Sequence, residues 1–126
     1  MRIIVPFAPG GITDSTARLV APKIQEAIGQ PVIVENKTGA SGSLGAEAVA
    51  KATDGHTFGL IGNAALTANP ILYAKLPYRV ADFAPITVVG SAPLLVVAAN
   101  AIRFDQPAQF FQQARQSAIP APRACA

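Results

Sequence analysis

The chain has 126 residues, which is enough for one ordinary domain with a hydrophobic core. Hydrophobic residues make up 51% and charged residues 13%, a balance that excludes a disordered acidic or basic tail. The formal net charge is +3, but the lysines and arginines are scattered singly and do not alternate with aromatic residues, which argues against a nucleic-acid-binding groove. The single cysteine, Cys125, excludes an internal disulfide and a cysteine-rich metal site.

The first residues predict a strand, a loop and a helix. Residues 2–5 are apolar and largely β-branched, as expected of a strand. Apolar residues then recur at helical spacing over 14–28, and Gly29 supplies the helix end. Pro22 lies inside this helix and predicts a kink near residues 18–22, because proline cannot donate a backbone hydrogen bond.

Further elements follow in a regular alternation. Residues 31–35 and 56–61 predict strands, the first of them buried on both faces, and residues 44–52 predict a helix capped by Ser43. Three strands alternating with two helices are typical of a parallel sheet with right-handed crossovers. Beyond them we expect a loop or short helix over 62–68, a break at Asn69–Pro70, strands at 86–89 and 94–98, a helix over 107–116, and a frayed tail.

Two segments of the sequence bear on targeting and membrane insertion. Met1 and Arg2 run directly into the first strand pattern, so we expect no secretory leader. Residues 84–102 carry no charge, but proline, glycine and asparagine interrupt them, which favours two buried strands over a membrane-spanning helix.

The loop after the first strand is the most informative segment of the chain. Its adjacent glycines, Gly10 and Gly11, permit backbone angles that side chains forbid, or serve only as a tight turn. Thr13, Asp14 and Ser15 are candidate N-caps of the following helix. Backbone N–H groups at the positive end of a helix attract anions, so the loop predicts an anion-binding cradle.

Two further loops are expected beside it. In an open parallel sheet, ligands bind outside the carboxyl ends of the strands, where loops 6–14, 36–42 and 62–67 would converge. Phe7 either lines a pocket there or belongs to the core. Asp14 is expected mainly as a cap and Asn63 as a support of its own loop, with direct ligand contact as the alternative for each.

Signatures of catalysis are missing from the sequence. The first loop lacks the Gly-x-Gly-x-x-Gly fingerprint, and no Walker loop occurs. His56 is the only histidine and has no nucleophile in a recognisable elbow near it, and metal ligands at usable spacing are absent. We therefore expect a binding protein without enzymatic activity, cofactor or metal.

Several motifs together resemble one known family. The segments IVPFAPGGITD at 4–14, QPVIVENKTGA at 30–40, GAEAVAKA at 45–52, DGHT at 54–57, and LPY at 76–78 followed by DFAP at 82–85 are similar to the receptors of tripartite tricarboxylate transporters, the TctC or Bug family. The resemblance covers residues 2–115 in order. Thr38 and Ser41 stand where the family usually has proline and glycine.

The resemblance implies an α/β lobe of a type II periplasmic-binding-protein fold that closes over a small carboxylate. It further implies a periplasmic location and, as partners, the membrane subunits of the transporter. The loops matching 6–14 and 62–65 would hold one ligand carboxylate through backbone groups and bridging waters. The ligand-binding residues expected on this basis are Phe7, Gly10, Gly11, Thr13, Asp14, Asn63, Ala64 and Ala65.

The expected domain organisation is incomplete relative to the family. Residues 1–100 would form the start of lobe 1, residues 101–117 the first helix of lobe 2, and residues 118–126 a tail without resemblance, as a frameshift or truncated gene would produce. Ligand capture would then be impaired, because a cleft needs two walls to exclude water. A small Rossmann-like nucleotide- or phosphate-binding domain or enzyme remains the alternative reading of the glycine loop.

Overall fold

The computed structural model describes residues 1–93, 95, 97, 106, 108–109 and 112. The chain divides into two units, Met1–Ser91 and Ala92–Ala126, and the fold below is that of the first unit. The expected strand at 94–98, helix at 107–116 and tail at 118–126 lie largely or wholly outside the described residues. The boundaries of the expected domains therefore remain predictions.

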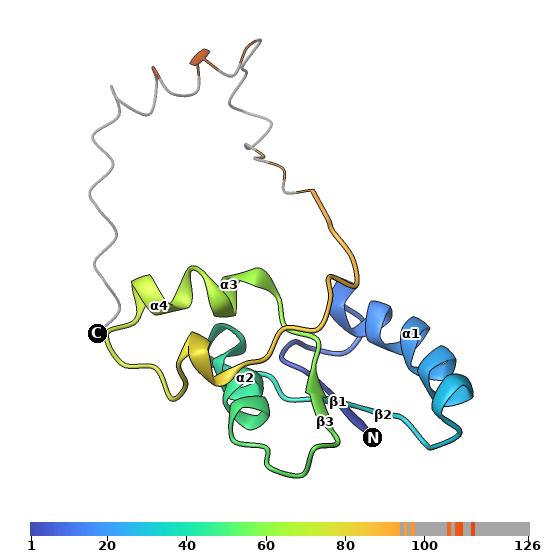
Figure 1. The fold of residues 1–126 in the computed structure, drawn as a ribbon. Coiled ribbons are helices and arrows are strands. Elements are labelled where there is room, and N and C mark those ends of the chain that lie inside the picture. Colours follow the sequence, from blue (N-terminus) through green and yellow to red (C-terminus); the bar gives the residue numbers. More distant parts are fainter. Residues whose placement is uncertain (94, 96, 98–105, 107, 110–111, 113–126) are drawn as a thin grey trace. The chain divides into compact units, whose positions relative to one another are not determined.

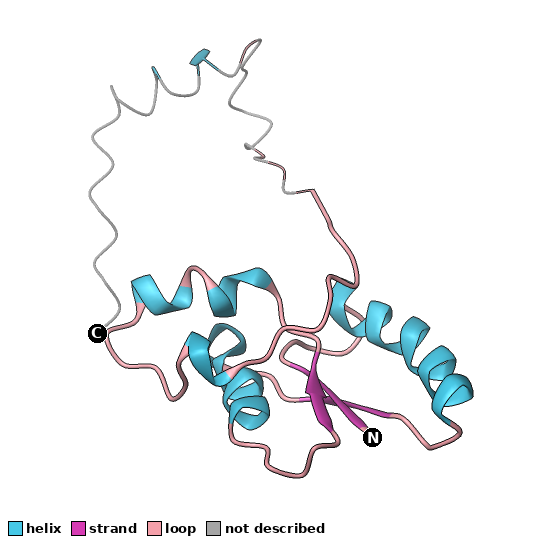
Figure 2. Cartoon of the chain, viewed as in Figure 1, coloured by secondary structure: helices cyan, strands magenta, loops and turns pink. Residues whose placement is uncertain are grey.

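The centre of the first unit is a parallel sheet (Figures 1 and 2). Strands β1 (Arg2–Val5), β2 (Ile33–Asn36) and β3 (Thr57–Gly59) lie in the order β2-β1-β3. The register pairs Val5 with Asn36 and Ile4 with Gly59, so the three carboxyl ends meet at one edge. The parallel sheet predicted from the alternating pattern is confirmed.

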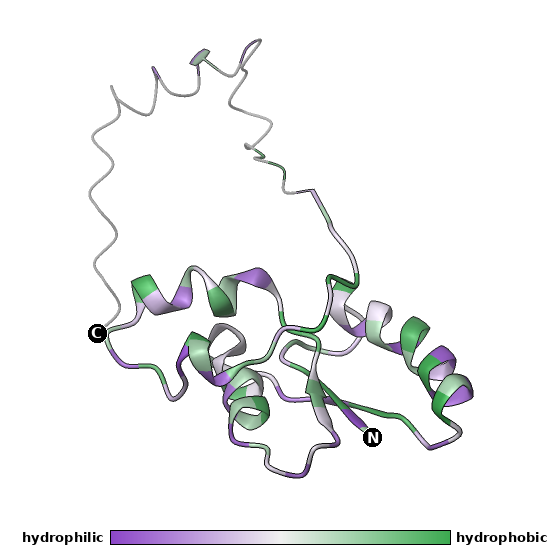
Figure 3. Ribbon diagram, viewed as in Figure 1, coloured by the Kyte–Doolittle hydropathy of each residue, from purple (hydrophilic) through white to green (hydrophobic). Residues whose placement is uncertain are grey.

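Helix α1 (Ile12–Ile28) covers one face of this sheet. Ile3 and Val5 of β1 are buried against Ala17 and Ala21 of the helix, because alanines allow the helix to approach the strand closely. Figure 3 shows apolar and polar residues alternating along α1, as expected of a helix with one solvent-facing side. The helix begins at Ile12 rather than at residue 14. It continues through Pro22 and ends at Gly29, whose φ of 65° is left-handed as a helix-ending glycine requires.

Helix α2 (Ser43–Ala50) covers the opposite face. A Cβ added to Gly59, the β3 partner of Ile4, would lie 2.9 Å from a methyl group of Val49 in α2. Because neighbours along a strand point to opposite faces, Ile4 and Gly59 face away from α1. The predicted cap Ser43 is the first helical residue, and Gly42 takes the cap position instead.

Strand β2 differs from its prediction. Its residues are half-buried or exposed, and Ile33 is 61% exposed, so the expected burial on both faces is wrong. The physical reason is that, among the strands of the described residues, β2 pairs only with β1 and therefore lies at the edge of the sheet.

Short helices follow β3. Helix α3 (Asn63–Leu66) and helix α4 (Asn69–Leu72) come in succession, and the 3-10 helix η1 (Ala40–Gly42) precedes α2. Asn69–Pro70 begins α4 instead of only breaking a pattern, since proline suits the first turn of a helix. A second cluster of buried residues joins Ala46, Ala65 and Tyr78, with Phe83 beside it after the 3-10 helix η2 (Val80–Asp82).

The predicted strand at 86–89 is absent. These residues form no regular structure, and Ile86 and Val88 are 75% and 83% exposed. The β-branched pattern alone was misleading, because strand formation depends on a neighbouring strand that no described segment offers here.

Candidate functional site

The three loops predicted to converge do meet at the carboxyl edge of the sheet. The ring of Phe7 lies between the second and third loops: Cβ atoms added at Gly42 and Gly62 would each lie 3.4 Å from it. Phe7 is half-buried and also packs against the core formed by Ile3, Val5, Ala17 and Ala21. The Phe7 side chain thus belongs to the hydrophobic core and also separates the second loop from the third.

The hydrogen bonds that hold the first loop converge on the carboxylate of Asp14, although Asp14 does not cap the helix. Gly11 is the N-cap and no side chain makes a capping hydrogen bond, so the expected caps at Thr13, Asp14 and Ser15 are wrong. Asp14 lies in the first turn of the helix, is 3% exposed, and accepts hydrogen bonds from Gly10 N at 2.9 Å and from Arg18 Nε at 3.0 Å. Its carboxylate folds the loop back onto the helix.

The same carboxylate ties the first loop to strand β2. Asn36 Nδ2 donates to Asp14 Oδ1 at 2.9 Å and to the Phe7 carbonyl at 3.0 Å. Arg18 Nη2 donates to Asn36 Oδ1 at 3.1 Å. The hydrogen bonds from Arg18, Gly10 and Asn36 lower the pKa of Asp14 to about 2, so the carboxylate is ionised at neutral pH. Asn36 was missed as a site residue because only the register places it beside Asp14.

Backbone donors remain at the start of helix α1. Gly10 N–H is engaged by Asp14 and Gly11 N–H by the Ala8 carbonyl at 3.4 Å, whereas the first bond into the helix is donated by Ser15. Within the described residues, the N–H groups of Ile12, Thr13 and Asp14 therefore have no acceptor. Arg18 offsets the negative charge of Asp14, so these donors are left at the positive end of a helix of 17 residues.

The third loop carries the remaining predicted residues. Asn63 and Ala64 are exposed at the start of α3, whereas Ala65 is buried and its carbonyl accepts a hydrogen bond from Tyr78 Oη at 2.7 Å. The side-chain amide of Asn63 has no hydrogen-bond partner among the described residues, whereas its carbonyl accepts hydrogen bonds from Thr67 N and Thr67 Oγ1, both at 2.9 Å. Its contact with a ligand, like that of the other named site residues, stays a prediction.

The second loop has an unusual backbone. Gly39, Ala40, Ser41 and Gly42 all have positive φ, including 46° and 52° at the two non-glycine residues. Gly45, in the first turn of α2, must also be glycine: an added Cβ would lie 2.8 Å from Pro6 Cα and 2.9 Å from the Lys37 carbonyl. The backbone of α2 thus packs closely against Pro6 of the first loop and Lys37 of the second.

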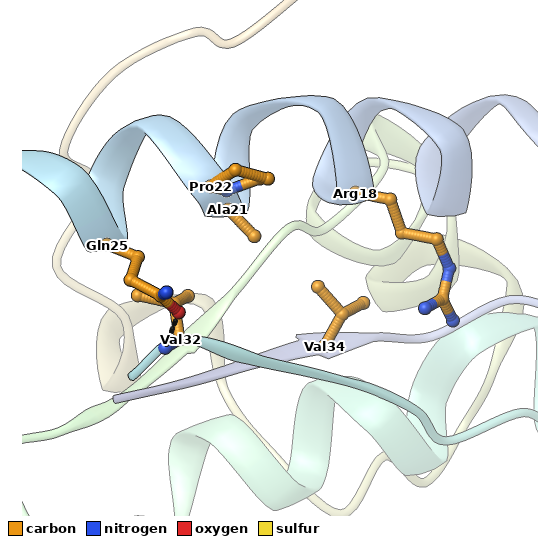
Figure 4. Close-up of a pocket in the computed structure, with 6 residues that line it drawn as sticks. All are labelled: Arg18, Ala21, Pro22, Gln25, Val32 and Val34. Carbon is orange, nitrogen blue, oxygen red and sulfur yellow. Dashed lines mark hydrogen bonds between the residues drawn. The ribbon is translucent and has the colours of Figure 1, made fainter. Parts of the chain in front are cut away.

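A pocket of about 320 Å³ lies elsewhere, between α1 and the edge strand β2 (Figure 4). Gln25 Oε1 accepts a hydrogen bond from Val32 N at one end, and Arg18 lies at the other. None of its lining residues is a predicted ligand contact, although Arg18 also donates hydrogen bonds to Asp14 and Asn36 at the three-loop edge.

The described residues contain no group of three or more His, Cys, Asp or Glu placed to hold a metal ion. In the same part of the chain, no helix is both long and apolar enough to cross a bilayer.

Comparisons with known proteins identify the family. The model of the tripartite tricarboxylate transporter receptor family, TctC, matches residues 16–121. The chain belongs to this family. BugT of Bordetella pertussis is 42% identical over 108 residues, which are 83% of this chain and 33% of BugT. A UPF0065 protein of Pseudomonas sp. strain P51 is 38% identical over 116 residues, 90% of this chain and 34% of that protein. The chain thus spans about a third of the length of these TctC relatives.

Solved structures agree with the TctC assignment. A periplasmic transporter protein matches with a TM-score of 0.61 and 45% identity, over 64% of this chain and 27% of that one. MatC from Rhodopseudomonas palustris, solved with malate, matches at 0.57 with 44% identity over 62% and 27%. An R. palustris protein solved with adipate matches at 0.59 with 39% identity over 64% and 27%. The fold is therefore part of the parallel α/β lobe of periplasmic binding proteins.

Proposed function

We propose that the carboxyl edge of this sheet binds a small carboxylate as part of an extracytoplasmic solute receptor. One observation carries the proposal: loops from three neighbouring strands meet around Phe7, beside backbone donors of α1 that have no acceptor in the described residues. A carboxylate can accept several such hydrogen bonds, directly or through water. The structural neighbours that hold malate and adipate support this ligand class.

The finer parts of the proposal follow from the family. The receptor would deliver its ligand to the membrane subunits of a tripartite tricarboxylate transporter and would act in the periplasm. Both parts are open to direct tests, by binding to membranes that contain those subunits and by cell fractionation. Binding without chemical conversion would suffice for this role, so no catalytic group is required.

Calorimetry tests the ligand class. Malate, adipate, citrate, glutamate and a nucleoside triphosphate are titrated into the chain under identical conditions. We expect at least one carboxylate to bind more tightly than the nucleotide. Nucleotide binding that exceeds every carboxylate would contradict the proposal and favour a phosphate-binding domain.

A proline substitution tests the backbone donors. Ile12 is 75% exposed, and Gly11 before it is already extended, as a residue preceding proline must be. Ile12→Pro therefore removes one first-turn N–H while the helix is kept. We expect weaker carboxylate binding in this variant and unchanged binding in the control Ile12→Ala, which keeps the N–H. Equal affinities of the two variants would exclude a role for this donor.

A further inference from the structure

The turn formed by residues 39–42 has a conformation that its own sequence does not favour. Ala40 and Ser41 have φ values of 46° and 52°, in the left-handed region that side chains disfavour. Such residues persist only where the surrounding structure holds them, and they concentrate at sites that bind ligands. Something outside the turn must therefore stabilise it.

The contacts around the turn identify what holds it. Asn69, the first residue of α4, is 3% exposed, and its Nδ2 donates to the Ser41 carbonyl and to Ser43 Oγ, each at 3.2 Å. Ser43 is 4% exposed, so this polar contact is shielded from water. A second, exposed hydrogen bond joins Ser41 Oγ and Tyr73 Oη at 3.1 Å.

The location of Asn69 gives this contact a functional meaning. Asn69 follows the third loop, whereas its acceptors lie in and directly after the second. Gly42 of the same turn lies against the ring of Phe7, which also contacts Gly62. A change at Asn69 would therefore alter the spacing of loops that meet at the proposed binding edge.

We propose that Asn69 is a positioning residue, which holds the 39–42 turn in its left-handed conformation and thereby shapes the carboxylate site. This role rests on the proposed function, because the site is the one proposed above. Asn69 itself need not touch the ligand. Its two donated hydrogen bonds offset the strain at Ala40 and Ser41.

Amide hydrogen exchange measures the turn without any ligand. Gly42 N donates to the Gly39 carbonyl and Ser43 N to the Ala40 carbonyl, so exchange at these two amides reports on the turn. We expect Asn69→Ala to raise both exchange rates at least about tenfold relative to the unmodified chain. Ser43→Ala, which removes only one acceptor, is expected to have a smaller effect and serves if Asn69→Ala does not fold.

The matched control is Tyr78→Phe. Tyr78 is 5% exposed and loses one buried hydrogen bond to the Ala65 carbonyl, so its general destabilisation is comparable while the turn keeps its contacts. We expect little change at Gly42 and Ser43 in this variant. Addition of Ala40→Gly to Asn69→Ala removes strain from the turn and should restore part of the protection, which a purely structural defect elsewhere would not show.

Malate titration of the same variants tests the link to binding. We expect Asn69→Ala to weaken malate binding about tenfold more than Tyr78→Phe does. Unchanged exchange in Asn69→Ala, or faster exchange with unchanged malate affinity, would overturn the positioning role. If the unmodified chain binds no carboxylate at all, the proposed function fails, and the exchange rates still decide separately whether Asn69 holds the turn.

Discussion

The two edges of the sheet each carry an aspartate with a similar set of partners, in very different surroundings. At the carboxyl edge, Asp14 is 3% exposed and bonds Gly10, Arg18 and Asn36. At the amino edge, the side chain of Asp54 is 43% exposed and accepts bonds from His56 N and Thr57 N, both at 2.9 Å.

The two aspartates both have a lowered pKa, but they connect different parts of the chain. The pKa of Asp54 is lowered to about 2 chiefly by the Thr57 hydroxyl and the His56 amide, and that of Asp14 to the same value chiefly by Arg18. Asp54 stabilises a turn that water can also solvate, whereas Asp14 joins a loop, a helix and a strand away from water. Burial, rather than the pKa, separates the two roles.

Neutralising each aspartate in turn should give the largest difference in stability loss between the two edges. Asp14→Asn replaces an acceptor with a donor among Gly10, Arg18 and Asn36, and water cannot compensate there. We expect this variant to lose more stability than any other in this series. Asp54→Asn should lose clearly less. Urea unfolding measures both, and equal losses would contradict the importance of burial.

Packing at the two edges offers the next comparison. Gly45→Ala forces a methyl group against the backbone of Pro6 and Lys37, and we expect it to lower the free energy of unfolding by about 3 kcal/mol. Gly55→Ala at the amino edge meets nothing within 4 Å and carries only the strain of its φ of 66°, for which we expect about 1 kcal/mol. A larger loss of stability in Gly55→Ala than in Gly45→Ala, measured by thermal unfolding, would contradict this difference between the edges.

Acid should remove the stabilisation that both aspartates contribute to the folded chain. Both carboxyl pKa values, about 2 in the folded chain, lie below the ordinary 3.8, so the folded state binds fewer protons than the unfolded state as the pH falls. The stabilisation is complete above about pH 4 and is lost as the pH falls toward 2. The free energy of unfolding, measured across this pH window, should fall with acid in the unmodified chain. It should fall much less in an Asp14→Asn/Asp54→Asn double variant.

A surface pair away from both edges should show the smallest effect. Lys23 and Glu26 pair on α1 at 3.2 Å with side chains 81% and 74% exposed. Solvent screening makes such pairs weak, so Lys23→Ala should change the free energy of unfolding by less than about 0.5 kcal/mol. Urea unfolding that gives a larger change would show that differences of this size cannot be assigned to either edge.

The sequence predicted the elements whose signals are local. Strand β1 begins and ends where its β-branched run does, and helix α1 ends at the glycine expected to end it. The convergence of the three loops followed from the parallel order alone. These features depend on periodicity, chain order and one glycine, all of which can be read directly.

The features that were missed depend on contacts between distant residues. Asn36 and Asn69 bond to groups 22 and 28 residues away, and nothing in their local sequence marks them. The expected strand at 86–89 failed for a related reason, because a strand exists only with a partner. Asp14 was mistaken for a cap because it lies in the first turn, whereas its partners are Gly10 before the helix, Arg18 one turn later and Asn36 of β2.

Amide chemical shifts recorded during a malate titration test the binding edge most directly. If the three-loop edge holds the carboxylate, saturable shifts appear at residues 10–14 and 62–65, while the amides of His56 and Thr57 at the opposite edge stay unchanged. Saturable shifts confined to His56 and Thr57 would contradict binding at the three-loop edge. So would loops that show no shift with malate but do show saturable shifts with a compound that carries no carboxylate.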